Sequence, residues 1–406
     1  MKCYTLIAWL LVLTMDTQLN ATENETAFVG DWLLQLDTGH GNIEVGLNVE
    51  VEEEKLVATI VNGPEKIALP ATGDGDCIQI PIPHYDSELE LKLVSQERLE
   101  GVWRKVRGLD KVAVMAATAD RPEKRIAENT GAFLGRWSVQ FADSADLAVA
   151  AFERFDDDGG SAVLGTFLTT TGDYRFLSGF VDGGTLYLSC FDGGHAFLFT
   201  MVRDGDSKLK GKFYSGNWYE DSFTATRDAD AKLPDAFLET KVVGNEKLEQ
   251  LSFPNLDGKI QSLKSDELMG KVTLIEVFGS WCPNCHDEAA YLAELRERYG
   301  ERGLKVVGLA FELTGDFERD ARQVQRYVDR FEVDYPILIA GTSDKALATE
   351  KFPVLDRIRS YPTTLFLDES GVIRATYTGF SGPATGQANK TLRSRFEALI
   401  EKLLDE

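Results

Sequence analysis

Residues 272–286 read VTLIEVFGSWCPNCH, and this stretch decides the fold of the C-terminal part of the chain. It begins as a nearly continuous apolar run, which is typical of a strand buried on both faces of a sheet. It ends in Cys282-Pro283-Asn284-Cys285-His286, which fits two templates. One is covalent haem attachment through C-x-x-C-H, and the other is a redox-active dithiol pair. The two templates predict different proteins.

The sequence around this stretch alternates between strand and helix patterns. LSFPNLDGKIQSL predicts a hairpin with a turn at Asp257-Gly258, and CPNCHDEAAYLAELRERYG has apolar residues at helical spacing. The remaining segments predict four strands and two helices. The strands are LKVVGLAF, YPILIA, TTLFLD and VIRATYTGF, and the helices are DFERDARQVQRYVDRFE and KTLRSRFEALIEKLL. Buried strands that alternate with helices indicate an α/β domain with a partly parallel sheet.

Cys282 is predicted to stand where the buried strand ends and a helix begins. There it faces unpaired backbone N–H groups and the positive end of the helix dipole, and both favour the reactive thiolate. Pro283 suits the first helical turn, where its missing N–H costs nothing. Cys285 lies one turn later, close enough to form a disulfide with Cys282 and to resolve a mixed disulfide. Trp281 is expected to shield the pair on one side.

Glu276 is the one charged residue inside the apolar run. A buried carboxylate is costly unless it is paired or protonated. Strand alternation places its side chain on the side from which the cysteines are approached, so a proton donor or acceptor for Cys285 is one interpretation. A solvated glutamate at the sheet edge is the other.

The haem interpretation requires His286 as an axial ligand in a largely helical protein. Here the motif closes a buried strand, and His286 is predicted to be an exposed residue of the first helical turn. No second Cys/His pair with suitable spacing follows, which argues against zinc. We therefore expect no haem, no metal and no cofactor other than the redox-active disulfide of Cys282 and Cys285.

Residues 247–406 resemble the thioredoxin-like domains of the TlpA/ResA type, a family of exported thiol–disulfide oxidoreductases. The resemblance rests on LIEVFGSWCPNC, LKVVGLAF and SYPTTLFLDESGVI. It implies a cis-proline loop in which Pro362 packs against the active-site disulfide. It also implies that the backbone at Tyr361 pairs with an incoming substrate strand.

The resemblance further implies roles for two acids. Glu276 stands where thioredoxins carry a buried acid, and Glu288 fits the acidic position that ResA-like members place near their cysteines. An exposed helix glutamate is the alternative for Glu288. The chain departs from the family at Ala289-Ala290, where a proline is common, and in the Pro-Asn dipeptide between the cysteines, which leaves the direction of electron flow open.

The region from about 27 to 228 is predicted to be all-β, because short alternating segments are separated by turn residues every 8 to 12 positions. FVGDWLLQL (28–36) and FLGRWSVQF (133–141) match with a shift of 105 residues. We expect two repeated antiparallel units, each a sandwich or a barrel, with Trp32 and Trp137 as equivalent core residues. Aromatic walls of a ligand cavity are the alternative.

The predicted boundaries are 1–21 for a signal peptide or anchor, 27–118 and 132–228 for the β units, 229–246 for a linker and 247–406 for the thioredoxin-like domain. Lys2 followed by the apolar run CYTLIAWLLVLTM resembles a secretory signal. The net charge is −23, with 22 basic and 40 acidic residues before Lys247 and 21 and 26 from there on. This acidity argues against nucleic-acid partners. Cys77 and Cys190 are expected either to pair in an oxidising compartment or to be buried free thiols.

The sequence therefore favours an exported thiol–disulfide oxidoreductase of the periplasm or cell envelope that acts as a disulfide reductant or interchange protein. Its partners would be protein thiols and disulfides, with a membrane electron donor as a further expected partner. The rival hypothesis is an envelope binding protein in which the β units bind a ligand or partner and the redox domain is regulatory.

Overall fold

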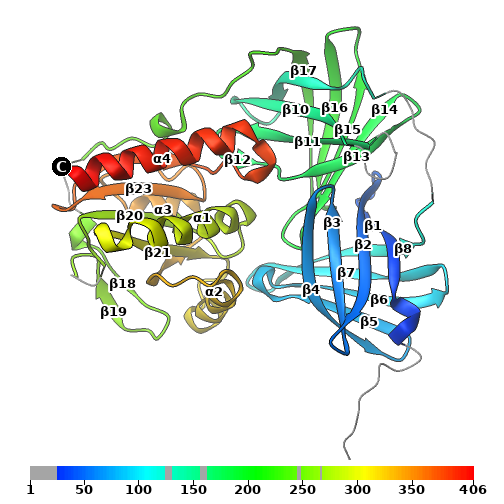
Figure 1. Cartoon of the computed structure of the whole chain (residues 1–406), viewed down its shortest axis with the longest axis horizontal. Coiled ribbons are helices and arrows are strands. Elements are labelled where there is room, and N and C mark those ends of the chain that lie inside the picture. Colours follow the sequence, from blue (N-terminus) through cyan, green and yellow to red (C-terminus); the bar gives the residue numbers. More distant parts are fainter. Residues whose placement is uncertain (1–24, 124–129, 156–161, 245–247, 266–267) are drawn as a thin grey trace, which may run out of the picture.

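The computed structural model describes residues 25–123, 130–155, 162–244, 248–265 and 268–406. They form two β-barrels and an α/β domain (Figure 1). The barrels stand one above the other on the right of the figure, and the α/β domain lies beside them. The predicted signal peptide or anchor, 1–21, lies outside the described residues. None of the described helices combines the length and the apolar character that crossing a bilayer requires.

The first barrel is a closed antiparallel meander in which each strand pairs with the next and the last pairs with the first. Alternate residues of its strands are buried, which is the period-two pattern of a barrel filled by side chains. Its elements are η1 (Glu25–Phe28), β1 (Gly30–Asp37), β2 (Asn42–Glu52), β3 (Lys55–Asn62), β4 (Glu65–Asp74), β5 (Cys77–Ile82), η2 (Pro83–Tyr85), β6 (Ser87–Ser95), β7 (Arg98–Gly108) and β8 (Lys111–Asp120).

The second barrel repeats this order with one additional short strand, β12, and it closes through pairing of β10 with β11. Its strands are β9 (Gly135–Phe141), β10 (Leu147–Phe155), β11 (Ala162–Thr169), β12 (Gly172–Asp173), β13 (Leu177–Asp182), β14 (Thr185–Phe191), β15 (Ala196–Arg203), β16 (Lys208–Ser215) and β17 (Tyr219–Arg227). The sequence predicted that each β unit is either a sandwich or a barrel, and the structure shows that both are barrels.

The repeated tryptophans anchor the first strand of each barrel. Trp32 and Trp137 are each 1% exposed, and each indole Nε1–H donates a 2.8 Å hydrogen bond to the carbonyl four residues earlier. An indole N–H that is buried needs such a partner. The prediction that both are core residues is confirmed, and the alternative of cavity walls is not supported because the side chains are packed and bonded.

The C-terminal domain has a five-stranded sheet in the order β22-β21-β20-β23-β24. β20, β21 and β22 run parallel, and β23 and β24 are antiparallel to their neighbours. The elements are η3 (Ala236–Leu238), η4 (Leu248–Gln250), β18 (Ser252–Pro254), β19 (Ile260–Ser262), β20 (Val272–Phe278), α1 (Pro283–Tyr299), η5 (Gly300–Arg302), β21 (Leu304–Glu312), α2 (Phe317–Phe331), β22 (Ile337–Thr342), α3 (Lys345–Glu350), β23 (Thr363–Asp368), β24 (Ile373–Thr378), η6 (Pro383–Thr385) and α4 (Gln387–Asp405).

Every residue of β20 is buried, as expected for the central strand of a sheet covered on both faces. The predicted thioredoxin-like α/β fold and the all-β N-terminal half are confirmed. The sequence analysis missed α3, a single helical region of six residues too short to show periodicity. The segment expected to be a linker contains η3, where Phe237 packs edge-to-face on Tyr377 of the sheet.

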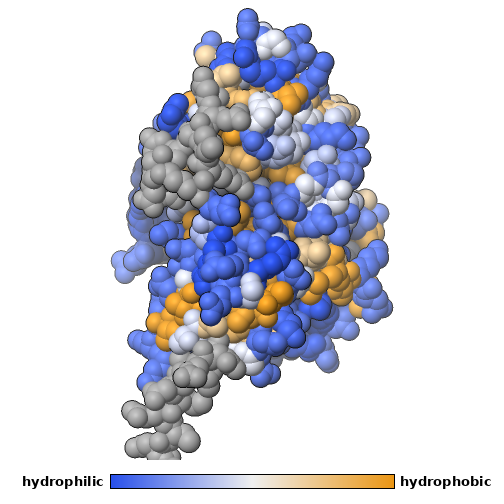
Figure 2. Space-filling model, turned by 90° about the vertical axis from the view of Figure 1, so that its right-hand side faces the viewer, coloured by the Kyte–Doolittle hydropathy of each residue, from blue (hydrophilic) through white to orange (hydrophobic). Residues whose placement is uncertain are grey.

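The two barrels contact each other through β2 and β3 of the first and β14 and β15 of the second. Asn62 makes two hydrogen bonds to the backbone of Phe191, at 2.9 and 3.0 Å. Phe191 is fully buried and meets Trp103 of the first barrel edge-to-face. Figure 2 looks onto the barrel side of the molecule, where hydrophilic side chains cover most of the coloured surface. Most large apolar side chains of the barrels are buried inside each barrel or between them, and some, such as Val51, Val94 and Leu147, are exposed.

Candidate active site

Cys282 is the N-cap residue of α1, directly after the buried strand β20. Its backbone is extended, with φ −100° and ψ 111°, and Pro283 occupies the first helical position. The predicted junction of strand and helix is present, so the unpaired N–H groups of the first turn lie beside the thiols. Cys282 is 7% exposed and Cys285 is fully buried, and both are free thiols.

The cis-proline loop faces the cysteines. The Tyr361–Pro362 peptide bond is cis, as the resemblance implied, and the Cys282 thiol lies 3.5 Å from the Tyr361 carbonyl oxygen. Trp281 donates from its indole to the Phe311 carbonyl at 2.9 Å and meets the Tyr361 ring edge-to-face at 5.6 Å. Trp281 and Tyr361 therefore form one wall beside Cys282.

Glu276 and Glu288 are both fully buried beneath the cysteines. Tyr335 donates to Glu276 at 3.2 Å, and Thr364 donates to Glu288 at 2.5 Å. Burial, reinforced by the nearby Glu288, raises the pKa of Glu276 well above its usual range. Burial also raises the pKa of Glu288 to about 8. Neither acid is the solvated edge or helix glutamate that the sequence left as an alternative.

The environment of Cys285 favours its neutral thiol. Burial, together with the hydrogen bond to Cys282 and the nearby Glu276, raises the pKa of the Cys285 thiol well above its usual range. A thiol of this kind needs a base before it can attack a disulfide. Glu276 contributes to the raised pKa of Cys285, and Glu288 contributes to the raised pKa of Glu276, so these two buried acids are the candidates to exchange its proton.

Ser280 holds the turn that leads into the motif. Its backbone N–H and its hydroxyl both donate to the buried Glu312, at 2.8 and 2.7 Å. Its carbonyl oxygen lies 2.6 Å from Nε2 of His286. Burial raises the pKa of Glu312 to about 7, although the two bonds from Ser280 oppose the shift. These contacts fix the backbone immediately before Cys282.

The prediction that His286 is exposed is wrong. Its side chain is 4% exposed, and its ring stacks on Tyr85 of the first barrel with centroids 4.5 Å apart. Phe331 of α2 packs on it as well, at 4.6 Å. Burial lowers the pKa of His286 well below its usual range. The error arose because the barrel that covers this face cannot be seen in the local sequence.

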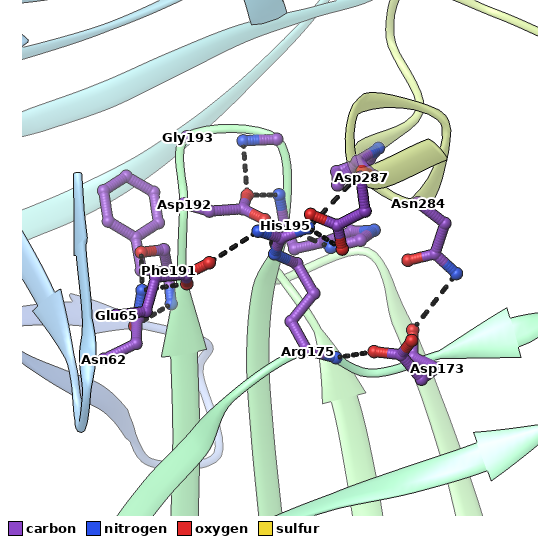
Figure 3. Close-up of polar contacts among 12 residues, drawn as sticks. Asn62, Glu65, Asp173, Arg175, Phe191, Asp192, Gly193, His195, Asn284 and Asp287 are labelled. Carbon is purple, nitrogen blue, oxygen red and sulfur yellow. Dashed lines mark hydrogen bonds and ion pairs between the residues drawn. The ribbon is translucent and has the colours of Figure 1, made fainter. Parts of the chain in front are cut away.

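The second barrel also touches the motif. The Asn284 side-chain amide donates to the Asp173 carbonyl at 3.3 Å, and Arg175 donates to the Pro283 carbonyl at 3.3 Å. Arg175 also forms an ion pair with Asp287 of α1 at 2.9 Å (Figure 3). Figure 3 shows Arg175 and Asp173 reaching from the barrel toward the first turn of α1. The residues between the two cysteines therefore contact a separate domain.

Sequence reasoning missed several of these residues. Glu312 gives a signal similar to that of Glu276, because it is an acid in a largely apolar strand, although it stands at the end of β21 and Glu276 lies inside β20; that signal could have found it. Arg175, Asp173 and Tyr85 give no local signal, because only the packing of three units brings them to the motif. Cys77 and Cys190 are free thiols in different barrels, the first half-buried and the second buried.

Part of the chain is similar to known proteins. The Redoxin family matches residues 232–392. The thioredoxin-like protein YneN of Bacillus subtilis is 32% identical over 128 residues, which cover 32% of this chain and 67% of YneN. ResA of Halalkalibacterium halodurans, a thiol-disulfide oxidoreductase, is 31% identical over 29% of this chain and 60% of its own length.

Two further similarities cover the same region. The thiol:disulfide interchange protein DsbE of Allochromatium vinosum is 30% identical over 32% of this chain and 64% of its own length. A solved thioredoxin family protein of Chlorobium tepidum, described as a thiol:disulfide interchange protein, is 20% identical, with a TM-score of 0.30 over 39% of this chain and 95% of that one.

Through its C-terminal domain, the chain belongs to the thioredoxin-like thiol–disulfide oxidoreductases. The Redoxin match begins at residue 232, after the last strand of the barrels. The chain also spans only about 60% of the length of ResA. What the redox domain acts on in the presence of the barrels is therefore taken up as a proposal.

Proposed function

We propose that this protein is an exported thiol–disulfide oxidoreductase in which Cys282 and Cys285 alternate between dithiol and disulfide, working as a disulfide reductant or interchange protein. The observation that carries the proposal is the position of Cys282. It lies at the N-terminus of α1, 3.5 Å from the Tyr361 carbonyl and above two buried glutamates. That combination supplies a nucleophile, a backbone site for a substrate strand and a route for a proton.

The reaction balances in two steps. The Cys282 thiolate attacks one sulfur of a substrate disulfide, forming a mixed disulfide and releasing the other substrate sulfur as a thiolate, which takes up a proton. Cys285, after losing its proton to the Glu276–Glu288 pair, attacks the Cys282 sulfur. This forms the protein disulfide and releases the second substrate thiol. The substrate disulfide gains two electrons and two protons, and the protein dithiol loses them.

Substitution of the cysteines tests this proposal. The reduced full-length protein should reduce both a small disulfide, such as hydroxyethyl disulfide, and insulin, and Cys282→Ser should abolish both activities. Cys285→Ser should instead accumulate a mixed disulfide on Cys282, which mass spectrometry of the non-reduced protein detects. Unchanged turnover in Cys282→Ser would rule the proposal out.

The reduction potential of the Cys282–Cys285 pair tests the direction. A value near that of thioredoxin, roughly −270 mV, is expected for a reductant, whereas roughly −120 mV would indicate an oxidant. Export is proposed from the sequence of the first 21 residues. Recovery of the full chain from the cell envelope fraction, and loss of that location when these residues are deleted, would support it.

A further inference from the structure

One connection of the second barrel bridges the two segments between which a substrate disulfide must enter. This connection, residues 170–176, joins β11 to β13 and contains β12. At one end the Thr171 carbonyl accepts a 2.7 Å hydrogen bond from Ser360, the residue before Tyr361. At the other end the Asp173 carbonyl accepts from Asn284, between the two cysteines. The connection therefore spans from the cis-proline loop to the redox motif.

A second layer comes from the corresponding turns of both barrels. The turn between β14 and β15, residues 192–195, places Gly194 against Pro283, and η2 of the first barrel places Tyr85 against His286. The two turns also hold each other, because Ser87 donates to the Gly193 carbonyl at 2.8 Å and Lys105 donates to the Gly194 carbonyl.

The fit of these turns depends on glycine at two positions. A Cβ on Gly172, whose φ is +140°, would overlap the Asn284 side-chain amide. A Cβ on Gly194 would lie 2.8 to 2.9 Å from Tyr85 and Pro283, a distance that real Cβ atoms do not show. The barrels thus approach the motif as closely as a backbone can, and a substrate chain cannot pass between them and the motif in this state.

Charged contacts connect the covering units to the redox domain. Arg175 is the centre, since its guanidinium forms ion pairs with Glu65 of the first barrel at 2.5 Å, Asp192 of the second at 3.1 Å and Asp287 of α1 at 2.9 Å (Figure 3). Three further ion pairs among the described residues cross the same boundary. They join Arg319 and Arg326 of α2 to Asp86 of the first barrel, and Arg359 of the cis-proline loop to Asp146 of the second.

We propose that the two barrels form a size-selective cap over Cys282, centred on Arg175, that admits small disulfides and excludes disulfides of folded proteins until the barrels separate from the redox domain. The cap consists of residues 170–176, residues 192–195 and η2. The proposal rests on the proposed function and adds to it the determinant of substrate size. In the closed state Cys282 is only 7% exposed.

Alkylation of the reduced full-length protein tests the cap independently of turnover. The rates of Cys282 modification by N-ethylmaleimide and by a polyethylene-glycol maleimide of several kilodaltons are compared, with Cys282 followed by peptide mass mapping. The rate with N-ethylmaleimide is divided by the rate with the polyethylene-glycol maleimide, so that the intrinsic reactivity of the thiol cancels from this ratio. In the wild type this ratio should exceed the ratio for free cysteine by about tenfold or more, because the large reagent must wait for opening.

Charge reversal at the boundary should open the cap. Asp287→Lys places a cation against Arg175, while the pairs of Arg175 with Glu65 and Asp192 remain inside the barrels. The ratio should then fall by about fivefold or more toward that of free cysteine. Asp86→Lys, which opposes Arg319 and Arg326 of α2, should shift the ratio in the same direction. The matched control is Glu294→Lys, also on α1, which faces Arg393 of α4 within the redox domain.

Each outcome decides the proposal. A wild-type ratio equal to that of free cysteine would overturn it, as would an unchanged ratio in both charge-reversal variants with native circular dichroism. If Asp287→Lys does not fold, Asp86→Lys decides alone. An equal shift in Glu294→Lys would also overturn the cap, because it would indicate general loosening. Retained reductase activity in Cys282→Ser would instead refute the proposed function and leave the measured ratio intact.

Discussion

The two barrels share one framework, but they differ in the connection that contacts Asn284 of the redox motif. In each, a tryptophan of the first strand donates to a carbonyl four residues earlier, and an arginine at the end of the last strand or directly after it covers its ring. The arginines are Arg121, 3.7 Å from the Trp32 ring centroid, and Arg227, 4.1 Å from that of Trp137. The repeated Phe-x-Gly-x-Trp motif thus encodes the same closure twice.

The difference lies between the third and fourth long strands. In the first barrel, β3 and β4 are joined by Gly63 and Pro64 alone, whereas in the second the corresponding connection runs over residues 170–176 and carries Asp173 and Arg175. Only the longer connection reaches the space between Ser360 and Asn284. The comparison indicates that the shared framework supplies stability. The extended connection adds contacts with Ser360 and Asn284 to those that the turn at residues 192–195 and η2 make with Pro283 and His286.

The largest expected effect tests the shared framework. Trp32→Ala and Trp137→Ala should each lower the free energy of unfolding of their barrel by about 3–5 kcal/mol, because each removes a fully buried ring and its hydrogen bond. Denaturant unfolding followed by intrinsic fluorescence of the remaining tryptophans measures both. Trp218→Ala, a half-buried control, should cost less. A large loss of unfolding free energy in one variant and none in the other would contradict the equivalence of Trp32 and Trp137.

The next effect compares the loss of stability caused by removing Arg175, on the extended connection, with the loss caused by removing an arginine elsewhere on the surface. Arg175→Ala leaves the carboxylates of Glu65 and Asp192 buried without their cation and should cost about 3 kcal/mol. Arg104→Ala, which removes exposed pairs with Glu88 and Glu90 on the first barrel, should cost less than about 1 kcal/mol. Calorimetric unfolding of both variants checks this, and equal losses would contradict the central place given to Arg175.

The smallest effect is a pH dependence of cap opening. Burial raises the pKa of Asp287 to about 7 in the closed molecule, with Arg175 opposing the shift and Asp173 and Glu65 adding to it. Opening exposes Asp287 and returns its pKa toward 3.8, so the closed state binds the proton more tightly between these values. Raising the pH from 6 to 8 should therefore favour the open state.

The alkylation ratio measures this dependence. Asp287→Lys is expected to lower the ratio, whereas Asp287→Asn is expected to keep it high. The wild-type ratio should fall severalfold between pH 6 and pH 8, consistent with loss of one bound proton on opening. Asp287→Asn cannot titrate there and should keep a high ratio at both pH values. A pH-dependent ratio in Asp287→Asn would assign the effect to another group.

The fold class was predictable because it depends on local patterns. Each of these patterns predicts local structure from a few neighbouring residues. They are the apolar strand at 272–278, the alternation in 27–228 and the repeated tryptophans. The cysteines and the cis bond at Pro362 follow from spacing and from family resemblance. The burial of His286 and the role of Arg175 could not be predicted, because both depend on the packing of three units against one another. The periodicity of apolar residues reports local structure and does not show which units pack together.

The central claim is that the barrels decide which disulfides reach Cys282, and one comparison of turnover tests it most directly. The kcat/KM for a folded protein disulfide is divided by that for hydroxyethyl disulfide, in the wild type and in Asp287→Lys. The account predicts a low quotient in the wild type and a severalfold rise in the variant, with turnover of the small disulfide little changed. An identical quotient in both proteins would contradict it.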